Sequence, residues 1–310
     1  MDVSRFPTLD PELLPILDLL PEMPDALDDL SVARAFLHSF LPTGPLPHEN
    51  EVDVADLQLP GGVRLRVYRP AASEGPLPGI LHIHGGGFCL GSIETEHAGA
   101  LGLSYALGAL VVSVDYRLAP EHPYPAGLED CLAGLDHLAG MNQVDPDRLI
   151  VHGQSAGGGL AAAVALRARD AGGPALAFQS LGIPELDDRL ETPSMQAFVD
   201  TPLWSRPQAI RSWEYYLGGK PADGYAAPAR MADVSGLPPA YITTMELDPL
   251  RDEGILYAMR LLAAGVSVEL HSFPGTFHGS AVAVDAAVSR RMSEELLVVL
   301  ARRLGTRVRR

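Results

Sequence analysis

Positive charge is scarce in this chain, and the scarcity excludes whole classes of partner. Lys220 is the only lysine, and the 23 lysines and arginines together are outnumbered by 39 aspartates and glutamates. The formal net charge is −16. Nucleic acids and anionic membranes attract basic surfaces, because their phosphates repel carboxylates. The composition thus predicts neither a nucleic-acid partner nor a membrane partner.

Long apolar runs and cysteines are also scarce. No run of about 18 apolar residues is present, so the sequence predicts no membrane-spanning helix. Residues 1–10 carry acids and no apolar segment, unlike a secretory signal. Cys89 and Cys131 are the 2 cysteines, and they match no metal or redox motif. These absences predict a cytoplasmic protein that uses no metal or other cofactor.

The most informative motif is the pentapeptide Gly153-Gln154-Ser155-Ala156-Gly157. It follows the apolar residues 149–151 and precedes an alanine-rich stretch, 158–168, which predicts a strand that turns sharply into a helix. Glycines on both sides of the serine let such a turn form without side-chain clashes. Nucleophile elbows of hydrolases have this form, with the serine exposed at the bend. The motif therefore predicts Ser155 as a nucleophile.

A glycine-rich loop lies upstream of this motif. Residues 80–83 predict a buried strand that leads into His84-Gly85-Gly86-Gly87-Phe88. Glycines let backbone N–H groups approach a ligand closely, because no Cβ stands in the way. Together with the N–H of Ala156, such a loop can form the oxyanion hole that an anionic tetrahedral intermediate needs. A turn without a catalytic role is the plainer alternative, and the pairing with the elbow makes it less favoured.

An acid and a histidine follow two further strand-like runs. Asp248 comes after residues 241–245, and His278 comes after residues 266–270. The resulting order, serine, then acid, then histidine, is that of α/β-hydrolases. Neutral His278 would remove the proton of Ser155, and Asp248 would fix the imidazole tautomer and stabilise the imidazolium.

The acid has rivals. Glu246 and Asp252 lie close to Asp248 in the sequence. Asp248 itself could serve only as the N-cap of a helix that has Pro249 at its first position. We favour Asp248 as the catalytic acid, because Pro249 keeps the preceding residue extended at the end of the strand.

His278 has one rival, His271. His271 lies inside a strand-like run, whereas His278 lies in a loop bounded by glycines, and catalytic residues usually lie in loops. No pair of the other histidines has a metal-ligand spacing with an acid or thiol as third ligand. We interpret these as structural or surface residues: His82, His84, His97, His122, His137 and His152.

These motifs resemble those of the hormone-sensitive-lipase-like family of α/β-hydrolase carboxylesterases. The matching stretches are residues 82–88, 115–126, 153–162, 248–252 and 278–279. The resemblance implies a catalytic triad of Ser155, Asp248 and His278. It also implies an oxyanion hole from the N–H groups of Gly86, Gly87 and Ala156. The implied reaction is hydrolysis of small-molecule esters with short to medium acyl chains, through an acyl-enzyme and without a cofactor. The sequence leaves open whether the protein forms a homodimer.

Two positions depart from the family pattern. Gln154 stands where members usually carry an acid before the nucleophile, and Ser280 stands where an aromatic residue is common. Neither position supplies a reacting group. We therefore expect them to affect rate and substrate preference, not the class of reaction.

Two alternative functions stay open. The same triad can attack other acyl groups, so an amidase or a lactonase is an alternative. Some relatives, such as the plant gibberellin receptor, have lost the catalytic histidine and bind a ligand without turnover. Because Ser155, Asp248 and His278 are all present here, we favour an enzyme over such a binding protein.

Strand-like and helical runs alternate along the chain, which predicts an α/β fold with a mostly parallel central sheet covered by helices. Residues 52–59 and 63–68 flank Pro60-Gly61-Gly62 and predict a β-hairpin. A closing helix is predicted over residues 281–304. The other strands are predicted at residues 80–84, 110–114, 149–152, 176–181, 241–245 and 266–270.

By resemblance, this is the α/β-hydrolase fold with a helical cap over the site. Residues 1–45, with a short amphipathic helix near 27–41, and the inserted residues 185–225 are expected to form the cap. The remainder of residues 46–310 forms the catalytic domain. A cap would shield an acyl-enzyme from water and build an apolar pocket. Phe88, Trp204 and Trp213 are expected to line this pocket, with anchoring of the insertion to the core as the plainer alternative.

Overall fold

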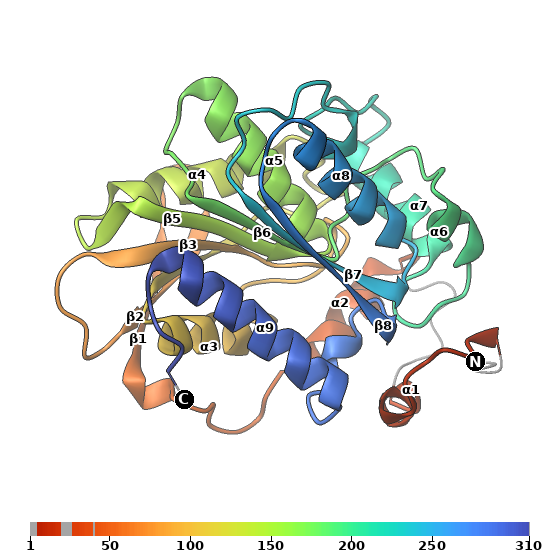
Figure 1. Cartoon of the computed structure of the whole chain (residues 1–310), viewed down its shortest axis with the longest axis horizontal. Helices are drawn as coiled ribbons and strands as arrows, with labels where there is room; N and C mark the ends of the chain where they lie inside the picture. The colour runs from red at the N-terminus through yellow and green to blue at the C-terminus, as the bar shows by residue number, and fades with distance from the viewer. Residues whose placement is uncertain (1–4, 20–26, 40, 310) are drawn as a thin grey trace.

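The central feature of the computed structural model, which describes residues 5–19, 27–39 and 41–309, is a mixed sheet. The sheet is 8-stranded, with the order β1-β2-β4-β3-β5-β6-β7-β8 (Figure 1). The predicted hairpin β1–β2 and the pair β2–β4 are antiparallel, and all other neighbours are parallel, which confirms a mostly parallel sheet. The strands are β1 (Val52–Gln58), β2 (Arg64–Pro70), β3 (Leu77–Ile83), β4 (Leu110–Asp115), β5 (Val144–Gln154), β6 (Phe178–Gly182), β7 (Ala240–Leu247) and β8 (Val268–Phe277).

Helices cover both faces of the sheet, as predicted (Figure 1). One face packs against α3 (His97–Leu107) and α9 (Ala287–Leu304), and the other against α4 (Ala126–Gly140), α5 (Ala156–Ala171) and α8 (Arg251–Ala263). Every residue of β3 is buried. Successive side chains alternate between the two cores, with Ile80 on the side of α3 and Leu81 on the side of α5. A parallel strand covered on both faces needs such a continuous apolar run.

The edge strand β8 is longer than its sequence pattern predicts. It continues past residue 270, through Pro274 and Gly275, to Phe277. A proline is tolerated there because β8 lies at the edge of the sheet and one side of it needs no ladder hydrogen bond. The N–H of Gly275 donates to the side chain of Glu246 instead. The extension places His278 directly at the end of a strand.

Two helices are shorter than predicted. α2 spans Leu30–Ser39, and the side chain of Asp29 accepts backbone N–H groups of its first turn; residue 40 lies outside the described residues. The closing helix α9 begins at Ala287, because a 3-10 turn at Ser280–Val282 and an extended Ala286 precede it. Among the helices of the described ranges, none is both long and apolar enough to cross a membrane.

The segments expected to form a cap gather at one edge of the sheet (Figure 1). Ala33 of α2, Met195 and Ala209 pack in one apolar cluster with Cys89 and Leu90, which follow the glycine loop. Residues 1–4 and 20–26 of the expected cap lie outside the described residues, and the division into cap and catalytic domain stays a prediction. The short elements are η2 (Pro11–Leu13), α1 (Leu14–Leu17), η3 (Glu49–Glu51), α6 (Pro193–Ala197), α7 (Arg206–Leu217) and η4 (Pro228–Arg230).

Candidate active site

Ser155 occupies the sharp turn between β5 and α5. Its backbone has φ 56° and ψ −126°, in the left-handed half of conformational space that serine seldom adopts. The surrounding structure holds this conformation, because the Ser155 N–H donates to the carbonyl of Gly182 at 2.8 Å. Strained residues of this kind gather at functional sites. The side chain is buried to 8 % exposure, at the end of the central strand β5.

The glycines that flank the serine have a steric role. A Cβ on Gly153 would lie 2.2 Å from the carbonyl oxygen of Gly157. A Cβ on Gly157 would lie 2.2 Å from the carbonyl oxygen of Ile83, on the neighbouring strand β3. No side chain can occupy either space. The pattern of glycine around Ser155 therefore follows from how closely α5 approaches the sheet.

We expect Gly157→Ala to destabilise the protein by at least about 3 kcal/mol, since overpacking against fixed backbone is at the costly end of core substitutions. Gly102→Ala is the matched control. Gly102 lies within α3 and has open space around its Cβ position, so alanine there should stabilise by roughly 0.5–1 kcal/mol. Urea unfolding measures both. A Gly157→Ala protein as stable as the wild type contradicts this packing.

The structure brings Ser155, His278 and Asp248 into one hydrogen-bonded chain. His278 Nε2 lies 2.9 Å from Ser155 Oγ, and His278 Nδ1 lies 2.7 Å from Asp248 Oδ2. The second carboxylate oxygen, Asp248 Oδ1, accepts the backbone N–H of Leu250 at 2.8 Å. Asp248 is fully buried and His278 is 6 % exposed. The ends of β5, β7 and β8 thus deliver the three side chains to one place.

The two rival acids bind elsewhere. Asp252 accepts the backbone N–H of Ser194 at 2.7 Å, which fastens α6 to the start of α8. Glu246 accepts the N–H of Gly275 at 2.7 Å. Asp248 also acts in part as a helix cap, the alternative role that the sequence offered, because it accepts the backbone N–H of Leu250 at the start of α8. It does so with one oxygen while the other faces the histidine.

Three of the other histidines, His271, His84 and His152, have contacts away from the triad. His271, the rival of His278, binds Glu295 at 2.6 Å. Burial lowers the pKa of His84, whose ring contacts the carbonyl of Gly85 at 2.8 Å. Burial also lowers the pKa of His152 to about 3, with the nearby His82 as a smaller cause. In the described ranges, no three side chains of the metal-binding types come together to hold a metal ion.

The glycine loop lies against the elbow. A Cβ on Gly85 would be 3.5 Å from Ser155 Cβ. Gly86 and Gly87 have φ 119° and 56°, values that favour glycine. Over the described backbone, no hydrogen bond uses the N–H of either residue. The N–H of Ala156 opens α5, where a helix cannot satisfy its own donors. Within the described backbone these N–H groups are therefore without a partner, as the predicted oxyanion hole requires.

The three predicted pocket aromatics divide into two groups. The Trp204 ring centroid lies 5.8 Å from that of His278, and the same ring packs on Gly87, where a Cβ would be 2.5 Å from it. Phe88 and Trp213 pack together at 5.3 Å and belong to the main apolar core. Trp204 therefore contacts both the triad and the glycine loop, whereas Phe88 and Trp213 support the loop from the core.

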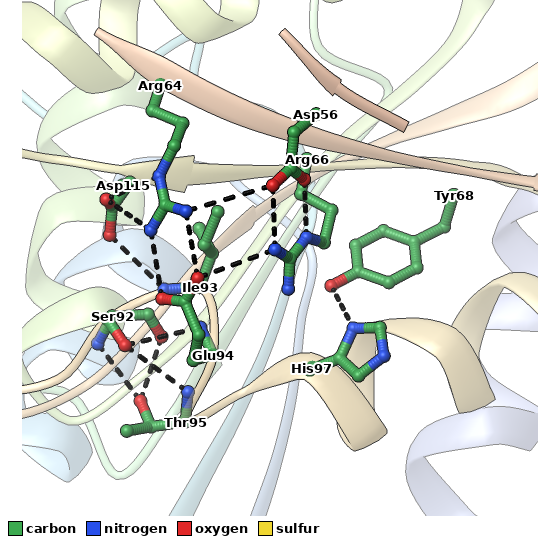
Figure 2. A network of polar contacts seen from close by, with 10 residues as sticks. All are labelled: Asp56, Arg64, Arg66, Tyr68, Ser92, Ile93, Glu94, Thr95, His97 and Asp115. Carbon is green, nitrogen blue, oxygen red and sulfur yellow. Dashed lines mark hydrogen bonds and ion pairs between the residues drawn. The ribbon is translucent and has the colours of Figure 1, made fainter. Parts of the chain in front are cut away.

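A network of polar contacts and ion pairs holds residues 92–95, which follow the glycine loop (Figure 2). Arg64 of β2 contacts Glu94 at 2.9 Å and Asp115, at the end of β4, at 3.0 Å. Arg66 also reaches Glu94, and Asp115 accepts the backbone N–H of Ile93. Single exposed ion pairs contribute little, but a network with shared partners fixes geometry. No sequence motif marks this anchor, because its members are scattered along the chain.

The two departures from the family pattern have ordinary surroundings. Gln154 is exposed at the end of β5, where its side chain packs beside Gly182. Ser280 is buried, and its hydroxyl donates to the sulfur of Met245 at 3.7 Å. Neither side chain has a polar contact with a triad residue in the described structure.

The fold agrees with comparisons to known proteins. The family described as "alpha/beta hydrolase fold" matches residues 80–282. Carboxylesterase NlhH of Mycobacterium tuberculosis is 42% identical over 285 residues, covering 88% of this chain and 89% of that protein. Esterase LipI of the same organism is 39% identical over 285 residues, covering 88% of each. A solved structure titled "Bacterial Heroin Esterase" has 50% identity and a TM-score of 0.92, covering 96% of this chain and 99% of that one. The chain belongs to the hormone-sensitive-lipase-like family of α/β-hydrolase carboxylesterases.

Proposed function

We propose that this protein is a serine carboxylesterase that hydrolyses small esters with short to medium acyl chains through an acyl-enzyme intermediate. One observation carries the proposal: a continuous hydrogen-bonded chain from Ser155 Oγ through His278 to Asp248, beside a glycine loop with unused N–H groups. Each member has the chemistry and the position that nucleophilic acyl transfer needs.

The first half of the reaction forms the acyl-enzyme. Nε2 of neutral His278 accepts the proton of Ser155 Oγ while the Ser155 oxygen attacks the ester carbonyl. The carbonyl oxygen becomes an anion and accepts hydrogen bonds from Gly86, Gly87 and Ala156. His278 then gives its proton to the departing alcohol, and the acyl group stays on Ser155. Asp248 stabilises the imidazolium and keeps Nδ1 protonated, since Leu250 holds its other oxygen.

The second half releases the acid. A water molecule enters where the alcohol left, His278 takes one of its protons, and the water oxygen attacks the acyl carbonyl. The resulting tetrahedral intermediate expels Ser155 Oγ, which takes the proton back from His278, and the carboxylic acid leaves. The same N–H donors stabilise the second anion, and each such donor is worth about 2.7–4 kcal/mol where one has been removed from a related site. The N-terminus of α5 points at this position, so the helix dipole adds to the effect.

The substrate class follows from what surrounds Ser155. The contacts of Trp204 with His278 and Gly87 support a bounded space, because the ring would limit the length of an acyl chain on Ser155. Each CH₂ that fits should contribute about 0.8 kcal/mol, and the first that does not fit should reverse the trend. We expect kcat/KM to peak at acyl chains of about four to eight carbons, a range implied by the family resemblance, because an apolar pocket of finite length produces such a turnover.

Trp204→Ala is expected to move this peak towards longer acyl chains, because it removes the ring that lies against the triad. Trp213→Ala is the matched control: it removes the same side chain from the core beside Phe88, so it should lower stability by about 3–5 kcal/mol and leave the peak in place. The kcat/KM values of a series of p-nitrophenyl esters give the answer. A monotonic rise to long-chain triglycerides, with activation at a lipid interface, contradicts a bounded pocket.

A panel of substrates tests the reaction class against its alternatives. Matched esters, amides and lactones with the same acyl group should show the ester as the best substrate, and an activated ester should give a burst of product equal to the enzyme concentration. Preference for the amide or the lactone makes the protein an amidase or a lactonase on the same triad. Tight binding without a burst makes it a ligand-binding member of the fold.

A further inference from the structure

Glu185 is a buried acid that the proposed mechanism does not use. It lies in the loop after β6 and its side chain is fully buried. Its backbone N–H donates to the carbonyl of Ser155 at 3.1 Å, and its own carbonyl is so close to α5 that a Cβ on Gly159 would be 2.1 Å away. The backbone of Glu185 therefore packs directly against the nucleophile elbow.

The Glu185 side chain is linked to the glycine loop through a serine of α7. Ser212 Oγ lies 2.9 Å from the carbonyl oxygen of Gly87 and 3.1 Å from Glu185 Oε1. A hydroxyl has one proton to donate, and a carbonyl can only accept. Both contacts are hydrogen bonds only when Ser212 donates to Gly87 and accepts from Glu185, which must then carry a proton.

The surroundings of Glu185 also favour the neutral acid. Its second oxygen, Oε2, is buried and has no partner among the described residues. A buried carboxylate without a cation or several donors is strongly disfavoured. Burial is the main cause that raises the pKa of Glu185 to about 8; the contact with Ser212 opposes this shift, and the charge of Asp248 adds to it. The charge of Glu185 also raises the pKa of four other groups, each an acid, a thiol or a phenol and none a cation: Glu253 of α8, Cys89, Tyr116 and Tyr216.

We propose that protonated Glu185 is a positioning residue that holds the glycine loop in place, by donating to Ser212, which in turn donates to the carbonyl of Gly87. The proposal rests on the proposed esterase function. The relay couples cap helix α7 to the peptide beside the Gly87 N–H, one of the donors to the oxyanion. When Glu185 loses its proton, Ser212 must donate to the carboxylate, and the carbonyl of Gly87 loses its partner.

The pH dependence follows from this exchange. Below pH 8 the acid is neutral and the relay is intact. As the pH rises through the pKa of about 8, the relay breaks. Wild-type kcat should therefore fall as the pH rises above about 8, because the carbonyl of Gly87 then loses its hydrogen-bond partner.

Three variants separate the relay from a merely structural role. Glu185→Gln keeps a donor to Ser212 and cannot ionise, so kcat should stay within a few-fold of the wild type at pH 7 and should no longer fall above pH 8. Ser212→Ala removes the link and should lower kcat roughly tenfold below pH 8, with little change in KM, which is less than the loss of a whole oxyanion donor. Its kcat should show no further fall above pH 8, where the wild-type relay is also broken. Glu253→Gln replaces another buried acid, which binds the N–H of Leu186, and should keep the fall above pH 8.

The test is the pH profile of kcat and KM from pH 5 to 10, with each protein returned to pH 7 to show that it stayed folded. Loss of the alkaline fall in Glu185→Gln, with its retention in Glu253→Gln, supports the relay. A wild-type kcat that stays flat to pH 10 overturns it, even if no variant folds. So does a Ser212→Ala enzyme with unchanged kcat. A burst at pH 7 in the wild type shows that the esterase function holds in either case.

Discussion

Replacing Ser155 with alanine is expected to reduce ester turnover by about 10⁶, the loss seen when a nucleophile of this kind is removed. The variant lacks the oxygen that attacks the carbonyl, and His278 has no other hydroxyl within hydrogen-bond distance in the described structure. The fold should be unaffected, because the turn at Ser155 is built for small residues. Steady-state assays with an activated ester, on protein purified free of host esterases, measure the loss.

Ser73→Ala is the matched control for this substitution. Ser73 lies after β2, where its hydroxyl donates to the carbonyl of Pro70, far along the chain from any triad member. It should keep wild-type activity, while both variants keep the wild-type circular dichroism spectrum. More than a few per cent of residual activity in Ser155→Ala would contradict the assignment of the nucleophile.

Asp248→Asn is expected to lower turnover by about 10⁴, because it reverses the imidazole tautomer. The structure gives the reason in detail. The N–H of Leu250 donates to Oδ1, so the amide oxygen of an asparagine would take that place and its NH₂ group would face His278. His278 would then accept at Nδ1 and carry its proton at Nε2. In that state it cannot accept the proton of Ser155.

Asp252→Asn is the matched control for the acid. This carboxylate lies at the start of α8 and accepts the N–H of Ser194, so its loss should loosen α6 and lower stability without removing activity. The kcat of both variants at pH 7 decides between the two residues. If Asp252→Asn is the less active protein, Asp248 is not the catalytic acid.

Much of the fold was predictable because its signals are local. Each predicted strand is an apolar run short enough for one crossing of the sheet, and the glycines at positions 153 and 157 mark a turn that no larger residue allows. The end of β8 was not predictable in the same way, because Pro274 and Gly275 are typical of a turn. They continue a strand here because β8 is an edge and the N–H of Gly275 is satisfied by Glu246.

The candidate site was predictable to the same extent. Ser155, Asp248 and His278 each follow a strand, and parallel strands bring their carboxyl ends to one edge of the sheet. Glu185 and Ser212 have no comparable signal. They lie in an irregular loop and in the middle of α7, and only the packing of α7 on the glycine loop brings them together. Packing likewise distinguishes Trp204 from Trp213, which the sequence left equivalent: both are buried, but Trp204 lies against His278 and Trp213 against Phe88.

The most direct test of the central claim is to identify the residue that carries the acyl group. The wild-type enzyme is mixed with a p-nitrophenyl ester, quenched in acid during the burst and digested for peptide mass spectrometry. The account predicts one acyl adduct per chain, on Ser155, and none in Ser155→Ala. An adduct on another residue, such as Cys89, or a burst that leaves Ser155 unmodified, contradicts it.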